Sequence, residues 1–483
     1  MHRSLSPGIA STILLSAFLS SSTFSQARIS EERIAAKVSQ SRLQGTVKDL
    51  VKIGNRLGGT KSGDRSAKFV LEKFRESGLK ADLLQDPEKL TFTNDRWLIR
   101  VEKPKRLRGL IQNEWLAGFS PSVKEKTVRL RTLKSSDEID KGSLDSTAVL
   151  VGFNVIQKKY RELAEAGVRC ILTYETVNSP AYTNWAMITS LASATDNPIP
   201  LFNISRTSGN RLWEEIGKGR EIVIRFSTKT TVRPGRPKTV MATIKGKSED
   251  YYIVCAHGDS DSGGPGADDN ASGVSGVLEV ARVLQESIRS KALPVPQKSV
   301  RFIVWGSEYF STENYVKTHE EELGKIQGVI NYDEIGTGKT RNCLYFEGND
   351  ISANEPMLRV FNAIGERYVG KKGFWKEATT NPSQGGTDSY VFLSDYLRKL
   401  NVPNAEIPSV TVYTAAWNEP RSMPQTSGWQ SKAWKGHRDS VVIDYSAYYH
   451  SSLDIPSLTT EKEPFNMVWG VKAVAIALLR LGW

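Results

Sequence analysis

Apolar residues recur at helical spacing in the first part of the chain, over residues 30–53 and 63–77. In such a pattern, positions three and four apart fall on one face of a helix. The second segment places Phe74 on its apolar face, and Gly78 follows as a C-terminal stop signal. We therefore expect two amphipathic helices at the entry to a larger fold.

Short strand-like runs alternate with helical patterns between about residues 113 and 231. The strand-like runs are 148–153, 168–174, 199–204 and 221–227, and the helical ones are 158–166 and 207–217. Residues 233–237, Arg-Pro-Gly-Arg-Pro, follow them, and Pro and Gly there cannot continue either element. We expect a compact inserted α/β unit with a linker after it.

The remainder of the chain again alternates apolar strands with amphipathic helices. The predicted strands are 251–256, 300–305 and 328–332, and the predicted helices are 271–287, 355–368 and 465–479. This alternation predicts an α/β fold with a mixed, largely parallel sheet flanked by helices. The predicted divisions are a signal peptide (1–27), a first part of the main domain (28–112), the inserted unit (113–231) and the main part of the same domain (232–483).

The first 27 residues have the features of an export signal. Arg3 is followed by an apolar run over 9–19, and Ser25-Gln26-Ala27 offers a small-x-small cleavage site. The run is shorter than the roughly 20 residues that span a bilayer. We expect export to the periplasm or the medium and no stable membrane anchor.

The chain carries 65 Lys and Arg against 53 Asp and Glu, a formal net charge of +12. These charges are spread along the chain rather than gathered in a run interleaved with aromatic residues, so nucleic-acid binding is not expected.

Polar side chains follow the predicted strands of the main domain directly. His257 follows 251–256, with Asp259 two residues later, and a ligand histidine commonly has such an orienting carboxylate. Glu308 and Asp333 come just after the next two strands. In open α/β sheets, function concentrates beyond the carboxyl ends of the strands, so we expect these groups to meet.

Two more elements add metal-binding side chains. The glycine-bounded turn over 265–273 contains Asp268 and Asp269, and the segment 448–454 contains His450. Imidazole and carboxylate ligands together with one unligated glutamate are the set that a zinc hydrolase requires.

The order of these motifs, from His-x-Asp through Gly-Ala-Asp-Asp-Asn-x-Ser-Gly to Tyr-His-Ser-x-x-Asp, resembles the secreted co-catalytic zinc exopeptidases. That family includes bacterial leucyl-type aminopeptidases and plasma glutamate carboxypeptidase-like dipeptidases. The resemblance implies a phosphorylase/hydrolase-like peptidase domain, and it implies that residues 113–231 are an inserted protease-associated domain.

The resemblance also implies the metal ligands. His257 and Asp333 would bind one zinc, His450 would bind a second, and Asp269 would bridge the two. Asp268 is the alternative bridge, and Asp269 is favoured because it directly precedes Asn270. Asp259 would orient His257, and Glu308 would be the general base.

One position departs from the family pattern. The family has two consecutive glutamates here, of which the second binds the zinc held by His450, whereas this chain has Glu308-Tyr309. Tyr309 could bind as a phenolate despite a reference pKa near 10, or Glu313 could substitute. Otherwise the site holds one zinc, or the chain binds peptides without cutting them. The cofactor is therefore expected to be one or two zinc ions.

Two residues are expected to contact the substrate by the same resemblance. Asp388 lies in Gly-Gly-Thr-Asp-Ser-Tyr, a segment that shapes the family's substrate pocket, although it is equally compatible with a turn before a helix. Tyr449 directly precedes His450.

Together these features favour an exported zinc exopeptidase acting on peptides, with aminopeptidase preferred over carboxypeptidase or dipeptidase action. A glutaminyl cyclase-like acyl transfer and a catalytically impaired peptide-binding homologue are the alternatives.

Overall fold

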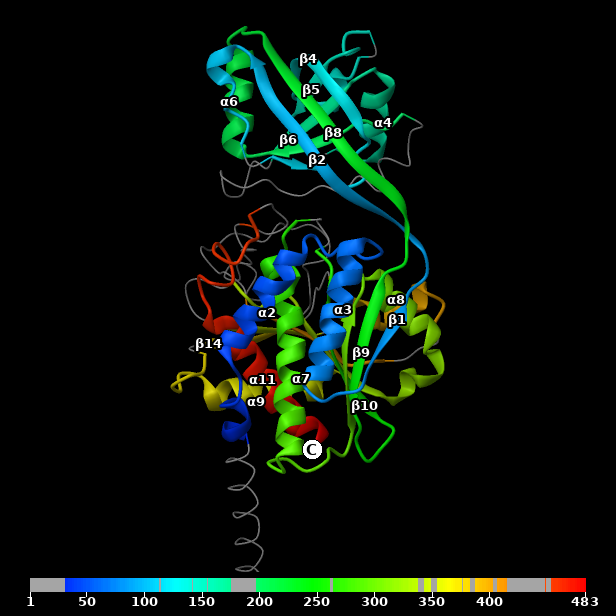
Figure 1. The fold of residues 1–483 in the computed structure, drawn as a ribbon, viewed down its shortest axis with the longest axis vertical. Helices are drawn as coiled ribbons and strands as arrows, with labels where there is room; N and C mark the ends of the chain where they lie inside the picture. The colour runs from blue at the N-terminus through cyan, green and yellow to red at the C-terminus, as the bar shows by residue number, and fades with distance from the viewer. Residues whose placement is uncertain are drawn as a thin grey trace, which may run out of the picture.

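The computed structural model arranges the residues that it describes around two β-sheets, each with its own helices (Figure 1). It describes residues 31–112, 114–140, 142–153, 155–174, 197–260, 264–337, 343–348, 354–375, 377–382, 387–402, 406–414, 448 and 453–483.

The main sheet has eight strands and is mixed, as expected. In spatial order they are β1 (Ala81–Gln85), β9 (Lys238–Ile244), β11 (Ser299–Trp305), β10 (Tyr251–His257), β12 (Ile326–Tyr332), β15 (Ser409–Tyr413), β13 (Cys343–Gly348) and β14 (Glu377–Pro382). β11, β10, β12 and β15 run parallel to one another, whereas β1, β9 and β13 pair antiparallel with their inner neighbours. The sequence predicted a mixed, largely parallel sheet flanked by helices, and this fold class is confirmed.

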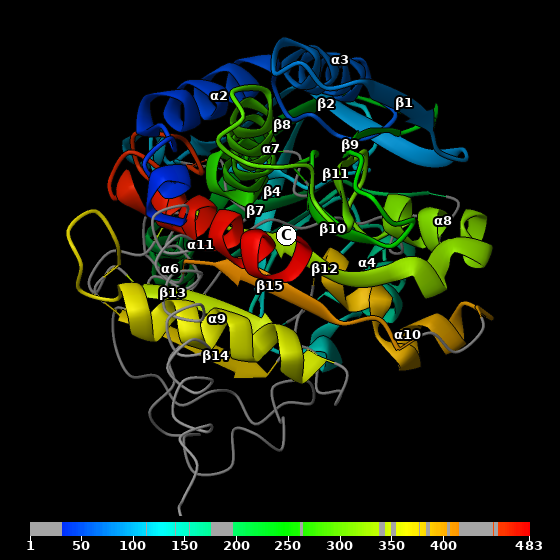
Figure 2. The same cartoon turned by 90° about the horizontal axis from the view of Figure 1, so that it is seen from below.

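Helices cover both faces of this sheet (Figure 2). One face carries α2 (Gln40–Ile53), α3 (Lys61–Glu76), α7 (Gly273–Arg289), α9 (Glu355–Tyr368) and α11 (Phe465–Gly482). The opposite face carries α8 (Phe310–Thr318) and α10 (Ser394–Lys399). α11 is long and apolar enough to cross a membrane by length and composition, but 72% of it is buried inside the fold, as in a core helix.

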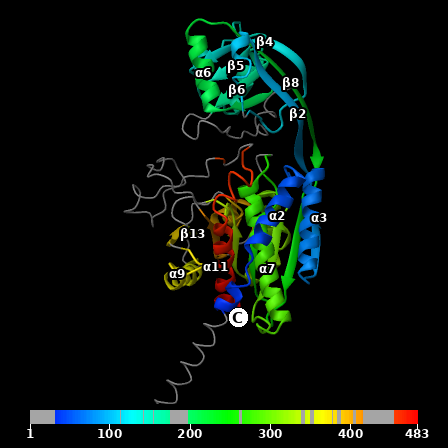
Figure 3. The same cartoon turned by 60° about the vertical axis from the view of Figure 1, so that its left-hand side comes forward.

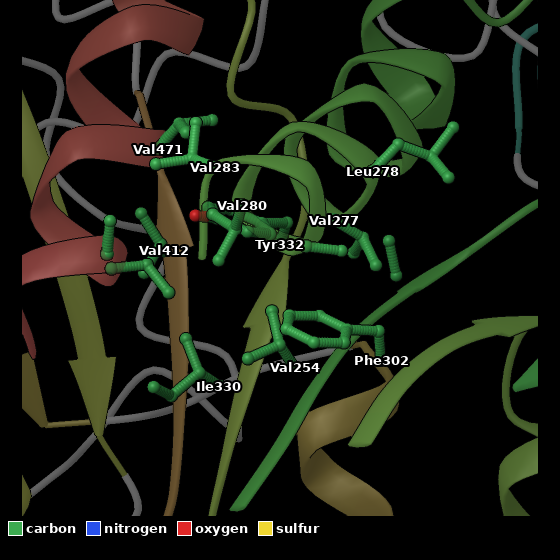
Figure 4. Packing of buried hydrophobic residues seen from close by; sticks show 14 of the residues in the cluster. Val254, Val277, Leu278, Val280, Val283, Phe302, Ile330, Tyr332, Val412 and Val471 are labelled. Atoms are coloured by element: carbon green, nitrogen blue, oxygen red, sulfur yellow. The ribbon is translucent and has the colours of Figure 1, made fainter. Parts of the chain in front are cut away.

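The strand residues alternate between the two layers of core. In β10, Tyr252 and Val254 pack on the side of α7, and Ile253 and Cys255 pack on the side of α8. Figure 4 shows the first of these layers, in which valines of α7 pack over β10, β11 and β12. This period of two is what a strand covered on both faces requires.

The second sheet has seven strands and forms a separate unit with α4 (Gln157–Glu165) and α6 (Arg206–Gly217) (Figures 1 and 3). In spatial order its strands are β2 (Lys89–Lys103), β8 (Ile222–Gly235), β4 (Val123–Leu133), β5 (Ala148–Val151), β6 (Cys170–Tyr174), β7 (Leu201–Ile204) and β3 (Trp115–Leu116). One of its core clusters is built only from its own residues, including Phe202, Ile224 and Phe226.

This second unit is larger than the segment 113–231 that the sequence indicated. β2 belongs to it, and β8 continues through Pro234 to Gly235, inside the predicted linker. β4 pairs with β8 only between Ile222 and Thr228. Beyond that point one edge of β8 is not hydrogen-bonded to β4, and proline is tolerated in such an edge segment. Its assignment as a protease-associated domain stays a prediction.

Candidate active site

The register of the parallel strands brings His257 and Asp333 together. Cys255 of β10 pairs with Asn331 of β12, so the positions two residues further on lie side by side and face the same way. His257 ends β10, Asp333 follows β12, and the His257 Nε2 lies 3.6 Å from the Asp333 Oδ1. The expected meeting of strand ends is therefore present.

Glu308 enters the same cluster from the next strand. It lies in the turn between β11 and α8, and β11 pairs with β10 so that Trp305 is opposite His257. Side-chain ligand atoms of His257, Glu308 and Asp333 all lie within 4.8 Å of one another. Among the residues that the structure describes, this is the group arranged to hold a metal ion.

Two aspartates lie beside the His257 ring. Its Nδ1 lies 3.1 Å from the backbone oxygen of Asp259 and 3.3 Å from the Oδ1 of that residue. Its Nε2 lies 3.3 Å from Oδ1 of Asp269. The ring thus presents Nε2 toward Asp269 and Asp333 while Asp259 holds the other nitrogen, which is how an orienting carboxylate sets a ligand histidine.

The cluster is buried and rich in negative charge. Burial opposes the charged imidazolium, but the carboxylates of Glu308 and Asp333 outweigh it and hold the pKa of His257 well above its usual range. Among the described residues, nothing donates a hydrogen bond to the buried Asp333 Oδ1. A buried carboxylate oxygen without a donor is costly unless a cation is present. The donor set, one imidazole with carboxylates, fits zinc.

Asp268 and Asp269 have different environments. Asp268 accepts hydrogen bonds from the N–H of Gly336 at 2.7 Å and the hydroxyl of Thr337 at 2.6 Å. Burial, with the nearby Asp454 carboxylate, raises its pKa to about 8. Asp269 is the one that lies beside His257. The preference for Asp269 as the ligand agrees with this geometry.

Asp454, the last residue of the predicted 448–454 motif, supports the acidic turn. Its two carboxylate oxygens accept the backbone N–H groups of Asp268 at 2.9 Å and Asp269 at 3.1 Å. Burial raises the pKa of Asp454 to about 7. Sequence reasoning placed Asp454 in a motif without giving it a role, and the structure gives it one.

Arg56 was missed by the sequence analysis. Its side chain is buried, with 1% of the residue exposed. It donates hydrogen bonds to the backbone oxygens of Gly54, Gly258, Pro265 and Gly266. Burial lowers its pKa to about 10, against the attraction of Asp454, Asp259 and Asp269. Arg56 therefore joins the two loops that carry His257's partners and supplies a positive charge beneath them.

Tyr309 occupies the position that raised doubt about the second metal. Burial, reinforced by the Glu308 carboxylate, raises the pKa of its phenol, which disfavours the phenolate. Its ring stacks on Tyr396, with centroids 6.5 Å apart. Glu313, the other candidate substitute, accepts a hydrogen bond of 2.5 Å from the Tyr396 hydroxyl.

Asp388 begins a short 3-10 helix and is completely buried. Its Oδ1 accepts the backbone N–H of Tyr309 at 3.0 Å and the hydroxyl of Thr312. Burial raises its pKa to about 7. The structure thus gives Asp388 a supporting contact beneath the site, and contact with substrate stays a prediction. His450 and Tyr449 lie outside the described residues.

The fold and site together define an α/β protein with a candidate metallohydrolase centre at the carboxyl ends of its parallel strands. Residues 239–467 match peptidase family M28. The matched range contains every predicted ligand and the predicted base.

Known proteins resemble the chain in sequence and in fold. An aminopeptidase of Pseudomonas aeruginosa is 35% identical over 146 residues, which cover 29% of this chain and 26% of that protein. The chain thus spans about a quarter of this relative. A peptidase M28 precursor from Shewanella amazonensis shares the fold with a TM-score of 0.66 and 17% identity, over 94% of this chain and 96% of the other. A zinc aminopeptidase from Bacillus subtilis gives a TM-score of 0.60 and 19% identity, over 92% and 96%.

Proposed function

We propose that this chain is a zinc-dependent exopeptidase that removes single residues from peptides, with aminopeptidase action favoured. The observation that carries the proposal is the meeting of His257, Glu308 and Asp333 within 4.8 Å at three adjacent strand ends. The M28 match over this region and the similarity to the Pseudomonas aeruginosa aminopeptidase support the same reading.

His257, Asp333 and Asp269 are the residues that would hold zinc, and His450 would hold a second ion if two are bound. Zinc held there supplies a Lewis acid that acidifies water and polarises a peptide carbonyl. Tyr309 weakens the second position, because its phenol is buried and disfavours ionisation. The proposal is that one zinc binds tightly.

Glu308 carries out the proton transfers. Its carboxylate accepts the proton of the attacking water and delivers it to the nitrogen of the leaving amine. Asp259 holds Nδ1 of His257 and so keeps Nε2 directed at the zinc position. The surrounding strands bury His257 and limit the access of bulk water to this face of the cluster.

Export and the inserted unit complete the proposal. The signal features of residues 1–27 support secretion of the mature chain, whose described part begins with residue 31. The second sheet, attached through β2 and β8, is proposed to be a protease-associated domain.

The test is mass spectrometry of a defined peptide pool incubated with the purified mature protein, with and without a chelator. The pool contains each peptide in free, N-acetylated and C-amidated forms. Chelator-sensitive loss of one residue from the free and amidated forms, but not the acetylated form, is expected. Loss blocked by amidation instead would indicate a carboxypeptidase. Loss of ammonia from an N-terminal glutamine without loss of a residue would indicate a cyclase.

Glu308→Gln tests the role of Glu308 as the base, because glutamine keeps the shape of the side chain but cannot accept the proton. Turnover is expected to fall by roughly 10²- to 10⁴-fold. The zinc content, measured by inductively coupled plasma mass spectrometry, is expected to stay that of the wild type. Retained turnover would remove Glu308 from the mechanism.

A further inference from the structure

The turn that carries Glu308 is held by side chains at consecutive backbone N–H groups. Gly306 donates to Oγ1 of Thr239 at 3.1 Å, and Ser307 donates to Oγ of Ser311 at 2.9 Å. The N–H of Glu308 donates to Oδ1 of Asp259 at 3.1 Å. The Tyr309 N–H continues the series with its bond to Asp388. Side chains therefore hold the backbone N–H groups of this turn, while the carbonyls of Ser307 and Glu308 accept backbone N–H groups of Ser311 and Phe310.

Two of these acceptors are hydroxyls, and both are directed by one carboxylate. Thr239 and Ser311 donate to the same atom, Oδ2 of Asp86, at 3.0 Å and 2.6 Å. A hydroxyl that gives its proton to a carboxylate keeps its lone pairs available to accept a backbone N–H. Asp86 thus fixes both hydroxyls in the accepting orientation that the turn needs.

Asp86 is itself firmly placed. Its Oδ1 accepts the side-chain N–H of Asn314 at 3.0 Å, and its backbone N–H donates to the oxygen of Pro237 at 3.0 Å. Asp86, Thr239 and Ser311 are each no more than 3% exposed. In a buried site, bonds to an ionised group are stronger than those between neutral groups.

We propose that Asp86 is a positioning residue for Glu308, acting through Thr239 and Ser311. This inference rests on the proposed role of Glu308 as the base. Asp86 lies between β1 and β2, and Thr239 lies at the start of β9, so the support comes from the two chain segments that lead into and out of the second sheet. Lys89 adds a contact from the same place, donating to Oγ of Ser307 at 2.8 Å.

Thr239→Val tests the proposal because valine keeps the shape of threonine and lacks the hydroxyl. The kcat is expected to fall by roughly 10- to 100-fold, as for a small misplacement of a catalytic group, with KM within about twofold of wild type. Thr239→Ser restores the hydroxyl and is expected to restore kcat. Ser311→Ala gives an independent loss of the second hydroxyl, and Asp86→Ala removes the carboxylate that accepts from both hydroxyls.

Thr228→Val is the matched structural control. The Thr228 hydroxyl accepts the N–H of Val123 at 2.8 Å and donates to the oxygen of Pro121 at 2.6 Å, in the second sheet. The Thr228→Val variant therefore loses the same two kinds of hydrogen bond without changing the Glu308 turn. Its kcat is expected to match that of the wild type. Equal kcat values in Thr239→Val and Thr228→Val would overturn the proposal.

Hydrogen exchange separates this inference from the proposed function. In a peptide covering residues 306–309, Thr239→Val is expected to exchange roughly fivefold faster or more, whereas Thr228→Val leaves that peptide unchanged. This readout applies even if no peptide substrate is cleaved, an outcome that would refute the function alone. Unchanged exchange in Thr239→Val would refute the support of the turn.

Discussion

The backbone N–H of Tyr309 donates a hydrogen bond of 3.0 Å to Oδ1 of Asp388. Tyr309 has φ 53° and ψ −52°, the conformation at the centre of the rare and strained form of γ-turn, which costs roughly 1–3 kcal/mol. The bond offsets part of that cost at the residue that directly follows Glu308. Asp388 therefore stabilises a strained turn, and this position explains its complete burial.

Asp388→Asn is expected to keep KM for peptides within about threefold of wild type, because the amide oxygen can accept the same bonds. Asp388→Ala leaves the Tyr309 N–H without its acceptor and is expected to cost roughly 1–3 kcal/mol of unfolding free energy. Chemical denaturation and steady-state kinetics measure both. A tenfold or larger rise in KM for Asp388→Asn, with unchanged stability, would instead place Asp388 at the substrate.

Tyr309→Phe is expected to leave the zinc content of the protein unchanged. The burial that raises the pKa of this phenol disfavours the phenolate that a metal requires. Plasma mass spectrometry of the purified variant, against wild type dialysed in the same buffer, gives the comparison. Loss of a zinc ion from Tyr309→Phe would show that the phenol is a ligand after all.

Arg56→Lys is expected to weaken zinc binding roughly 10- to 100-fold, the usual effect of losing a residue that supports metal ligands. A lysine has three donors on one atom and cannot span the carbonyls of Gly258, Pro265 and Gly266. Competition with a chromogenic chelator measures the affinity. Arg282→Lys, in the middle of α7 where the arginine pairs with Glu279 and Glu286, is the control and is expected to bind zinc as the wild type does.

Glu31→Gln tests the link between the start of the described chain and α11. Burial raises the pKa of Glu31, but the hydrogen bonds from Arg480 and Tyr368 outweigh this effect and lower it below 4.5. Stability from this ion pair is therefore complete above pH 4.5 and is lost as pH falls through the folded-state pKa. The free energy of unfolding of the wild type is expected to exceed that of Glu31→Gln by roughly 1–3 kcal/mol at pH 7. This difference is expected to shrink as the pH falls. A difference that is constant with pH in urea titrations would contradict this assignment.

One feature of the sequence predicted both the central strands of the fold and the central residues of the site. Buried parallel strands are short apolar runs, and chemistry follows their carboxyl ends, so His257, Glu308 and Asp333 could be placed from local pattern alone. α9 was predicted with the bounds it has, Glu355–Tyr368. β2 was not assigned, because its residues alternate irregularly and its pairing with β8 is set by contacts distant in the sequence.

The supporting residues could not be predicted in this way. Arg56 acts on backbone oxygens of loops far along the chain, and a bond to a carbonyl requires no particular side chain in the partner. Asp86 likewise depends on hydroxyls of Thr239 and Ser311, which no local spacing connects with it. Such contacts are specified by the folded arrangement rather than by periodicity.

The pairing of β2 with β8 also bears on how the chain folds. β1 pairs with β9, although all strands of the second sheet lie between them in the sequence. A contact between residues so far apart in the sequence forms slowly by itself. Lys89 is opposite Gly235 at the base of β2 and β8, so once these two strands have zipped together, the ends of β1 and β9 are already adjacent. Formation of the second sheet thereby speeds the pairing of β1 with β9 at the edge of the main sheet.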